Sequence, residues 1–306
     1  MRAAIITELG AEPVLGERPD PVAGEGGVLV HVSTAALNPA DLVYASGIRL
    51  KPSTPFVPGI EAVGRTPDGK RVYFYPAQHP HGTFAEQAVA HLGQVQPLAD
   101  DITDEQALCL GVAGTTAWLA LTYKAGIQPG ESVLVLGATG SVGQIAVQAA
   151  KALGARRVVA AGRDRETLDT LLDHGADTVV TLDEGYESRL VDASEGGFDL
   201  VVDSLFGDPM VAGIRATRAG GRIVNLGMRA GRTVELPGIP LKGRDLLSCS
   251  IDMVPTAVKA RAFGDLCQVA RTGGIHVEFE RTALADVAET WKRQATSPHC
   301  KLLIVP

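Results

Sequence analysis

Residues Val133–Ala155 place an apolar segment, a turn of small residues and an apolar-faced helical segment in direct succession. Gly140 has no Cβ that would keep an anion away from the backbone, and Gly143 allows a helix to pack closely on the preceding strand. The N–H groups at the start of such a helix, together with its dipole, attract a diphosphate. A strand, this turn and a helix in this order predict a dinucleotide-binding βαβ unit.

The same alternation continues along the middle of the chain. Helices are expected at 142–153, 165–175 and 209–221, and apolar strands at 132–137, 157–162, 177–182, 198–205, 221–227 and 246–251. Strands without polar residues that alternate with helices are typical of a parallel sheet covered on both faces. These residues therefore predict a doubly wound α/β domain with six strands.

With 306 residues, the chain is long enough for two domains. The first part, to about Gln96, consists of short apolar runs separated by Gly and Pro, which indicates an irregular β-rich domain. Helical spacing at 104–126 suggests helices that join the two domains. A terminal strand at 301–306 needs a sheet, and the central sheet already has six strands, so we expect the C-terminal segment to rejoin the first domain. The predicted domains are residues 1–112 with 253–306, and residues 113–252.

Composition excludes some classes of function. A net charge of −7 gives no electrostatic reason for binding nucleic acid or an anionic membrane. The N-terminal segment fits neither a signal peptide nor a membrane span, so we expect a cytoplasmic protein. The cysteines are far apart and are expected to be buried thiols, with neither a disulfide framework nor a local metal site: Cys109, Cys249, Cys267 and Cys300.

The end of the second strand of the α/β domain indicates which dinucleotide binds. NAD enzymes place an acidic residue there on the ribose, whereas this strand ends at Gly162 and is followed by Arg163. An arginine can bond a 2′-phosphate, so NADPH is favoured. In the alternative, Asp164 reaches the ribose, and Arg163 and Arg165 are solvated surface. Four of the expected cofactor contacts end later strands on the ligand side; the full set is Gly137, Ala138, Thr139, Gly140, Ser141, Val142, Gly143, Gly162, Arg163, Arg165, Ser204, Leu205, Leu226 and Gly227.

Several motifs together resemble one family over essentially the whole chain. They lie at residues 36–47, 56–64, 82–89, 114–121 and 137–155, and they resemble the medium-chain dehydrogenase/reductases, in particular the zinc-independent quinone oxidoreductase (zeta-crystallin-like) branch. The resemblance implies a GroES-like β-rich catalytic domain, built from both ends of the chain, and a Rossmann domain.

The residues that bind zinc in the alcohol dehydrogenases of this superfamily are absent. Those enzymes have a Cys near the position of Asn38, a His-Glu pair where this chain has Ile60–Glu61, and a four-Cys lobe that is missing after Tyr75. His79 and His81 lie in a Pro/Gly loop that is expected to be solvated. Without thiolate or imidazole ligands no zinc ion would activate an alcohol, so no metal is expected.

Hydride transfer to a conjugated carbonyl needs alignment and hydrogen-bond donors more than a metal. The resemblance places Asn38 in the substrate pocket as a carbonyl donor and Thr116 near the nicotinamide. Tyr44 could donate a proton, although family members often carry the pocket tyrosine at the position of Val43, and an ordinary half-buried Tyr is an equal alternative. Without the resemblance, the Asn-Pro pair at residues 38–39 would indicate only a structural turn.

Two carboxylates near these residues also have structural interpretations. Asp41 is expected to be a local turn or capping carboxylate rather than a base. Glu61 belongs to a family-typical motif, but a buried carboxylate bound to backbone or Arg is at least as good an interpretation as catalysis.

The predicted function is that of a cytoplasmic NADPH-dependent oxidoreductase that reduces a quinone or an α,β-unsaturated carbonyl compound without zinc. An enoyl-thioester reductase is the enzymatic alternative, and a non-catalytic NADPH-binding protein is the alternative from another class. The apolar segment 246–254 at the sheet edge would be an aggregation hazard if left open, so a homodimer through this edge is expected.

Overall fold

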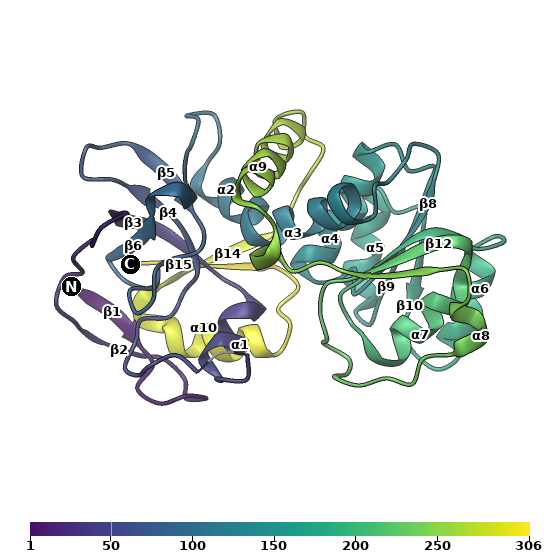
Figure 1. Ribbon diagram of the computed structural model, residues 1–306, viewed down its shortest axis with the longest axis horizontal. Helices are drawn as coiled ribbons and strands as arrows, with labels where there is room; N and C mark the ends of the chain where they lie inside the picture. Colours follow the sequence, from purple (N-terminus) through teal and green to yellow (C-terminus); the bar gives the residue numbers. More distant parts are fainter. Residues whose placement is uncertain (50) are drawn as a thin grey trace. The chain divides into compact units, whose positions relative to one another are not determined.

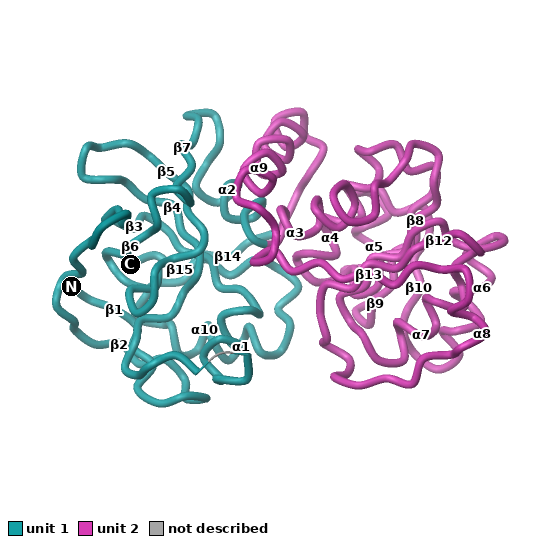
Figure 2. The backbone as a smooth tube through the Cα atoms, viewed as in Figure 1, with its two compact units in different colours: residues 1–112, 278–306 teal, residues 113–277 magenta. Residues whose placement is uncertain are grey.

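The computed structural model describes residues 1–49 and 51–306, which form two compact units (Figures 1 and 2). Unit 1 contains Met1–Val112 and Glu278–Pro306, and unit 2 contains Ala113–Val277. The first division falls where the sequence predicts it. The second was predicted between residues 252 and 253, and this is wrong, because residues 253–277 belong to unit 2.

Helix α9 (Thr256–Arg271) shows why the second division lies later. It packs against α3 (Thr115–Leu119) of unit 2. Beyond the helix, the side chain of Gln148 donates to the carbonyl of His276 and accepts from its N–H, both at 2.7 Å. The chain therefore stays bound to unit 2 until Val277.

Unit 2 is the expected doubly wound α/β domain. All neighbouring strands in its sheet are parallel, and β8 and β11 are buried along their whole length. The six strands lie in the order β10 (Thr178–Thr181), β9 (Arg157–Gly162), β8 (Ser132–Leu136), β11 (Phe198–Asp203), β12 (Thr217–Asn225) and β13 (Asp245–Ser248). The order reverses between β8 and β11, where ligands of such sheets bind.

Helices of unit 2 pack on this sheet through apolar faces. In α4 the eight residues 143–150 are all buried, which seats the helix firmly on the strands. Helix α6 (Tyr186–Ala193) was not expected from the sequence. The remaining helices are α4 (Ser141–Ala152), α5 (Arg165–Asp173), α7 (Gly207–Ala216) and α8 (Gly238–Leu241), with π-helical turns at Leu110–Gly114 and Ala120–Lys124 next to α3 and a 3₁₀ turn at Ile251–Met253.

Unit 1 is β-rich, as predicted, and contains strands from both ends of the chain. The terminal strand β15 pairs antiparallel with β3, so the C-terminal segment does rejoin the first part of the chain. The larger sheet has the order β14 (Phe279–Ala283), β15 (Lys301–Val305), β3 (Gly27–Leu37), β4 (Glu61–Arg65), β5 (Arg71–Phe74) and β7 (Val95–Pro97), with β6 (Gln87–His91) also paired to β3. A second sheet pairs β1 (Arg2–Ile5) with β2 (Val14–Glu17).

Three short helices complete unit 1. Helices α1 and α10 contact each other, and α2 contacts β3, β4 and β15. Their bounds are α1 (Pro39–Ala45), α2 (Asp104–Cys109) and α10 (Val287–Ala295), and 3₁₀ turns lie at Leu92–Gln94 and Leu284–Asp286. The core they enclose contains Leu37, Phe74 and Phe84, all without significant exposure.

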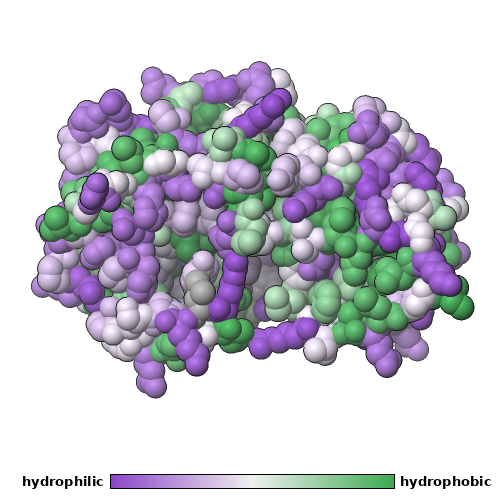
Figure 3. Space-filling model, viewed as in Figure 1, coloured by the Kyte–Doolittle hydropathy of each residue, from purple (hydrophilic) through white to green (hydrophobic). Residues whose placement is uncertain are grey.

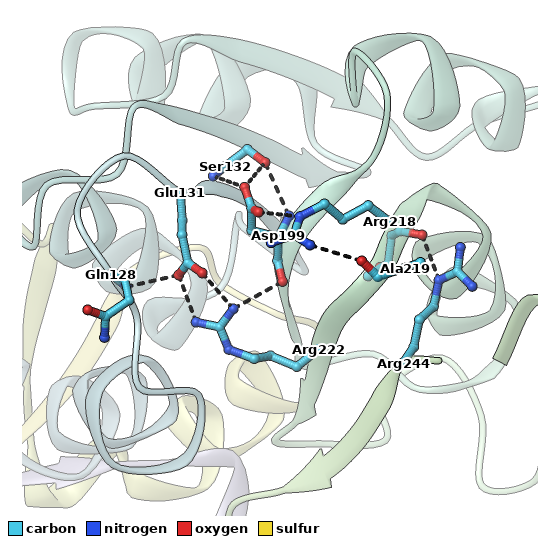
Figure 4. A network of polar contacts seen from close by, with 9 residues as sticks. Gln128, Glu131, Ser132, Asp199, Arg218, Ala219, Arg222 and Arg244 are labelled. Atoms are coloured by element: carbon cyan, nitrogen blue, oxygen red, sulfur yellow. Dashed lines mark hydrogen bonds and ion pairs between the residues drawn. The ribbon is translucent and has the colours of Figure 1, made fainter. Parts of the chain in front are cut away.

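An ion-pair network joins the strands of unit 2 at the end where β8 and β11 begin (Figure 4). Arg222 bonds both oxygens of Glu131, at 2.9 and 2.7 Å, and also donates to the carbonyls of Ala125 and Asp199. Burial alone would raise the pKa of Glu131, but hydrogen bonds from Arg222 and the N–H of Gln128 lower it. This network stabilises the end of the sheet opposite to the strands' carboxyl ends.

The distribution of hydrophobic residues and the burial of the cysteines can be compared with what the composition predicts. Hydrophobic and hydrophilic residues are interspersed on the face drawn in Figure 3. Cys109, Cys249 and Cys267 are buried thiols, as predicted, and Cys300 is half-buried. Within the part of the chain that the structure describes, no helix is long and apolar enough to cross a membrane.

Candidate functional site

The turn between β8 and α4 is built around its glycines. Gly137 has a φ of +79°, a backbone conformation that residues other than glycine rarely adopt. A Cβ on Gly143 would lie 2.2 Å from the carbonyl oxygen of Gly137, so only glycine permits this approach of helix and strand. At the exposed Gly140 a Cβ would meet no atom closer than 3.7 Å, which leaves the backbone open in front of the helix. The turn fits a diphosphate.

The rest of the turn is held against the next strand. The N–H groups of Gly137 and Ala138 both donate to the carbonyl of Ala161, at 2.9 Å. Thr139 is buried, and a Cβ on Gly162 would lie 2.6 Å from its methyl group. Ser141 and Val142 are half-buried in the first turn of α4. The structure therefore brings the predicted turn residues together with Gly162 at the end of β9.

Three charged residues follow β9 and differ in their surroundings. Asp164 accepts a hydrogen bond from the N–H of Thr167 at 2.8 Å and so caps α5. Arg165 forms an exposed ion pair with Asp169 at 2.8 Å. Arg163 is exposed, and its guanidinium has no ion-pair partner within residues 1–49 and 51–306. Of the two predicted arginines, Arg163 is the one available to an anionic group.

The carboxyl ends of β8, β11 and β12 lie close together. The N–H of Ser204 donates to the carbonyl of Leu136 at 3.1 Å, and the N–H of Leu226 donates to that of Asp203 at 2.7 Å. A Cβ on Gly227 would lie 2.8 Å from the carbonyl oxygen of Ser204. The predicted contacts Ser204, Leu205, Leu226 and Gly227 are thus neighbours at one edge of the sheet.

Two residues under this edge were missed by the sequence reasoning. Asp203 is fully buried, and its carboxylate accepts hydrogen bonds from the N–H groups of Leu205 and Phe206 and from the amide of Asn225. Burial raises the pKa of Asp203, although these hydrogen bonds oppose the shift. A signal was present, because each residue is a polar side chain at the carboxyl end of its strand, directly after an apolar run (200–202 and 223–224).

A second constellation, inside unit 1, surrounds Glu61. This fully buried carboxylate accepts from Asn38 Nδ2 and Lys301 Nζ on one oxygen, both at 2.9 Å. Its other oxygen accepts from Tyr73 at 2.9 Å and from the N–H of Val112 at 2.7 Å. Glu61 is therefore a buried carboxylate bound to backbone, as one interpretation predicted, and its cation is Lys301 rather than an arginine.

Asn38 is held in this cluster by both ends of its amide. Its oxygen accepts from Lys301 Nζ at 2.6 Å, and its nitrogen donates to Glu61 and, at 3.3 Å, to the carbonyl of Ala36. A substrate carbonyl could accept a hydrogen bond from this amide only if that bond replaced the longer one, from Asn38 to the carbonyl of Ala36. The Lys301 partner was missed because it lies 263 residues away in sequence.

Asp41 occupies the first turn of α1 in the same buried region. One carboxylate oxygen accepts from the N–H of Asn38 at 2.8 Å, so the predicted capping role is confirmed. The other oxygen is buried and has no hydrogen-bond partner within the described residues. Burial raises the pKa of Asp41 to about 7, and the nearby charge of Glu61 contributes to this shift. The hydrogen bond from the N–H of Asn38 acts in the opposite direction and lowers the pKa.

The other predicted catalytic residues are less deeply placed. Tyr44 is half-buried on α1, and Thr116 is half-buried on α3. Asn38 and Tyr44 belong to unit 1, whereas Thr116 belongs to unit 2. Within the residues that the structure describes, no three His, Cys, Asp or Glu side chains form a group that could hold a metal ion.

Comparisons with known proteins agree with this architecture. Residues 141–273 match the family model described as "Zinc-binding dehydrogenase". The chain is 34% identical over 221 residues to one component of the phenolphthiocerol/phthiocerol polyketide synthase of Mycobacterium tuberculosis, and the match covers 66% of this chain but only 10% of that protein. The chain thus spans about a tenth of the length of that relative.

Relatives of similar size are quinone oxidoreductases. The human quinone oxidoreductase is 32% identical over 252 residues, covering 77% of this chain and 75% of that protein. The structure of the quinone oxidoreductase from Thermus thermophilus, solved also as its complex with NADPH, is similar over the full length of both chains, with a TM-score of 0.87 and 28% identity. The chain belongs to the medium-chain dehydrogenase/reductase family, in its quinone oxidoreductase branch.

Proposed function

We propose that this chain is an NADPH-dependent oxidoreductase that transfers hydride to a quinone or an α,β-unsaturated carbonyl compound without zinc. The observation that carries the proposal is the glycine turn of unit 2, whose backbone is open at Gly140, together with the exposed Arg163, which has no ion-pair partner among the described residues. The quinone oxidoreductase relatives and the NADPH complex of the Thermus protein support it.

The residues of unit 2 suit NADPH. The start of α4 would bind the diphosphate, and Arg163 would bond the 2′-phosphate through a charged hydrogen bond. Asp164 is engaged in capping α5, which makes it a poorer partner for the ribose of NAD. Ser204, Leu205, Leu226 and Gly227 would contact the nicotinamide half. When bound, the reduced nicotinamide supplies the hydride.

For the substrate, we propose Asn38 as the donor to the carbonyl oxygen, with Thr116 near the nicotinamide and Tyr44 as a proton donor. Lys301 and Glu61 fix which end of the Asn38 amide carries the hydrogens, because one faces its oxygen and the other its nitrogen. A donor oriented in this way stabilises negative charge on the substrate oxygen once its 3.3 Å bond to Ala36 is exchanged for one to the substrate.

Zinc is not needed in this scheme. The position beside Glu61 is filled by the ammonium group of Lys301, and the side chains that bond to Glu61 here are an amide, a hydroxyl and this ammonium group. Such a set is a poor match to a catalytic zinc site.

An enoyl-thioester reductase is the second candidate, favoured by the similarity to a segment of a polyketide synthase. The chemistry is the same addition of hydride to a conjugated carbonyl, but the acceptor is carried on a thioester. A substrate of this kind brings a phosphate-bearing arm, which the quinones and simple enones lack.

We also propose a homodimer in which the β13 edges of two copies pair. Among the described residues β13 is the terminal strand of the sheet, paired with β12, and Leu246 within it is exposed. Ile239 and Met253, which flank β13 in sequence, are strongly exposed as well. An open apolar edge of this kind favours pairing with a second chain. A monomer mass in light scattering at micromolar concentration would contradict the dimer.

The function is tested by binding and turnover in sequence. NADPH and NADH are titrated into the purified chain, with coenzyme fluorescence as the signal. We expect NADPH to bind more tightly, and Arg163→Ala to remove this preference, a loss of roughly tenfold or more for one charged hydrogen bond. Arg165→Ala is the matched control, because Arg165 is already paired with Asp169.

Turnover then separates the candidates. Oxidation of NADPH by 1,4-benzoquinone, 9,10-phenanthrenequinone or a simple enone supports the quinone and enone reductase. Oxidation only by an enoyl-coenzyme A supports the thioester reductase. Tight NADPH binding without oxidation by any of these acceptors would leave a non-catalytic NADPH-binding protein, and zinc addition or chelation should change none of the rates.

A further inference from the structure

We infer that Asp203 and Asn225 are positioning residues, which hold in place the two loops that receive the nicotinamide half of the coenzyme. The inference rests on the proposed function, since it concerns the same coenzyme site. Asp203 is the last residue of β11 and Asn225 the last residue of β12.

One carboxylate and one amide join both loops. Asp203 Oδ1 accepts from the N–H of Leu205 at 2.9 Å and from that of Phe206 at 3.1 Å. Its Oδ2 accepts from Asn225 Nδ2 at 2.6 Å, and the same nitrogen donates to the carbonyl of Gly227 at 2.8 Å. The loop after β11 and the loop after β12 are therefore bonded to a single buried pair.

The backbone at Phe206 shows that this pair determines a conformation. Phe206 has φ +58° and ψ −165°, and the next residue, Gly207, also has a positive φ of +64°. A side chain rarely adopts such angles, and they persist only where the surroundings hold them. The N–H of Phe206 is held by both oxygens of Asp203, each at 3.1 Å.

The two loops also lie against each other. A Cβ on Gly227 would lie 2.8 Å from the carbonyl oxygen of Ser204, and one on Gly137 would lie 3.3 Å from Ser204 Cβ. The hydroxyl oxygen of Ser204 is buried there and has no hydrogen-bond partner within the described residues. A displaced loop after β11 would shift the loop after β12 and crowd the glycine turn.

The position in the sheet tells which half of the coenzyme is affected. A dinucleotide lies across the point where the strand order reverses, here between β8 and β11, with one nucleotide half on each side. Arg163, at the end of β9, belongs to the adenosine side. The loops held by Asp203 and Asn225 lie on the other side of this point. They are therefore the loops that would contact the nicotinamide half.

The test compares two ligands on the full chain by titration calorimetry. NADPH spans both sides of the sheet, whereas adenosine 2′,5′-bisphosphate occupies only the adenosine side. For Asp203→Asn, which keeps the shape of the side chain and replaces an acceptor by a donor facing Asn225, we expect the Kd of NADPH to rise about tenfold or more. The Kd of the bisphosphate should stay within about twofold of that of the wild type.

Two further variants keep the test decisive. Asn225→Ala removes the other half of the pair without a new donor, and the same selective loss is expected if Asp203→Asn does not fold. Glu131→Gln is the control, because Glu131 joins the same sheet at its opposite end. It should lower the Tm and leave both dissociation constants unchanged.

An unchanged NADPH affinity in both variants, or an equal loss for both ligands, would overturn the inference. A wild-type protein that binds neither ligand would instead refute the proposed function. The two failures are therefore distinguishable in one experiment.

Discussion

Lys301→Met tests whether the buried cluster of unit 1 depends on its cation. The ammonium group lies 2.9 Å from Glu61 Oε1 and 2.6 Å from Asn38 Oδ1, and the two charged side chains are only 2% and 0% exposed. Met keeps the length of the side chain but leaves the Glu61 carboxylate with neutral donors alone. Removing one partner of a buried ion pair costs about 3–5 kcal/mol.

For a cooperative unit of this size, this loss corresponds to a fall of roughly 10–17 °C in the Tm. Calorimetry measures it directly, and urea unfolding supplies the free energy of unfolding. The double variant Glu61→Gln/Lys301→Met should recover most of the loss, because a neutral amide is then buried in place of a lone carboxylate. NADPH affinity serves as the control, since the glycine turn belongs to unit 2.

The reasoning would be refuted if Lys301→Met unfolded within about 1 kcal/mol of the wild type. It would also be refuted if the double variant were no more stable than the single one. In either case the carboxylate of Glu61 would be satisfied by its hydrogen bonds without the nearby charge.

Three further changes give distinct signatures. Gly143→Ala should weaken NADPH binding at least about tenfold and lower the Tm, since its Cβ would lie 2.2 Å from a backbone oxygen; unchanged binding in titration would contradict this. Gly264→Ala, in α9 with nothing within 4 Å of the added Cβ, should instead raise the free energy of unfolding by roughly 0.5–1 kcal/mol in urea. Asp41 has a pKa raised from 3.8 to about 7, so its stabilising contribution is complete below pH 3.8 and is lost as the pH rises to 7. Relative to Asp41→Asn, the wild type should lose up to about 4 kcal/mol over this range, and a difference independent of pH would contradict it.

The fold of unit 2 could be predicted because its strands contain short apolar runs that alternate with helical segments. Helix α6 was missed for a physical reason, since only Leu190 of its eight residues is buried, and Tyr186 and Ala193 on the same face are half-buried. Helix α9 lies in the segment that the sequence analysis assigned to the wrong unit. Its sequence shows that one face is apolar but not which surface covers that face, and α3 covers it.

The site was predictable where chemistry depends on local sequence. The glycine spacing and Arg163 follow from neighbours along the chain, and so does the cap by Asp41. Lys301 could not be found in this way, because its partners Asn38 and Glu61 lie 263 and 240 residues away. A lysine that opens an apolar strand is usually exposed, and only the pairing of β15 with β3 brings it to the carboxylate.

The cluster around Glu61 in unit 1 and the Asp203–Asn225 pair in unit 2 are both organised by a buried carboxylate. Glu61 and Asp203 are fully buried carboxylates, and each accepts hydrogen bonds from at least one backbone N–H group as well as from an asparagine amide. Burying a carboxylate is costly unless its oxygens are satisfied, so any movement of those donors is penalised. A cation balances Glu61, whereas within the described residues no cation bonds Asp203, whose pKa burial raises. Lys301→Met should therefore destabilise unit 1, because it leaves the charge of Glu61 without a cation, and the free energy of unfolding measures this. Asp203→Asn should instead displace the two loops of unit 2, and the Kd of NADPH measures this.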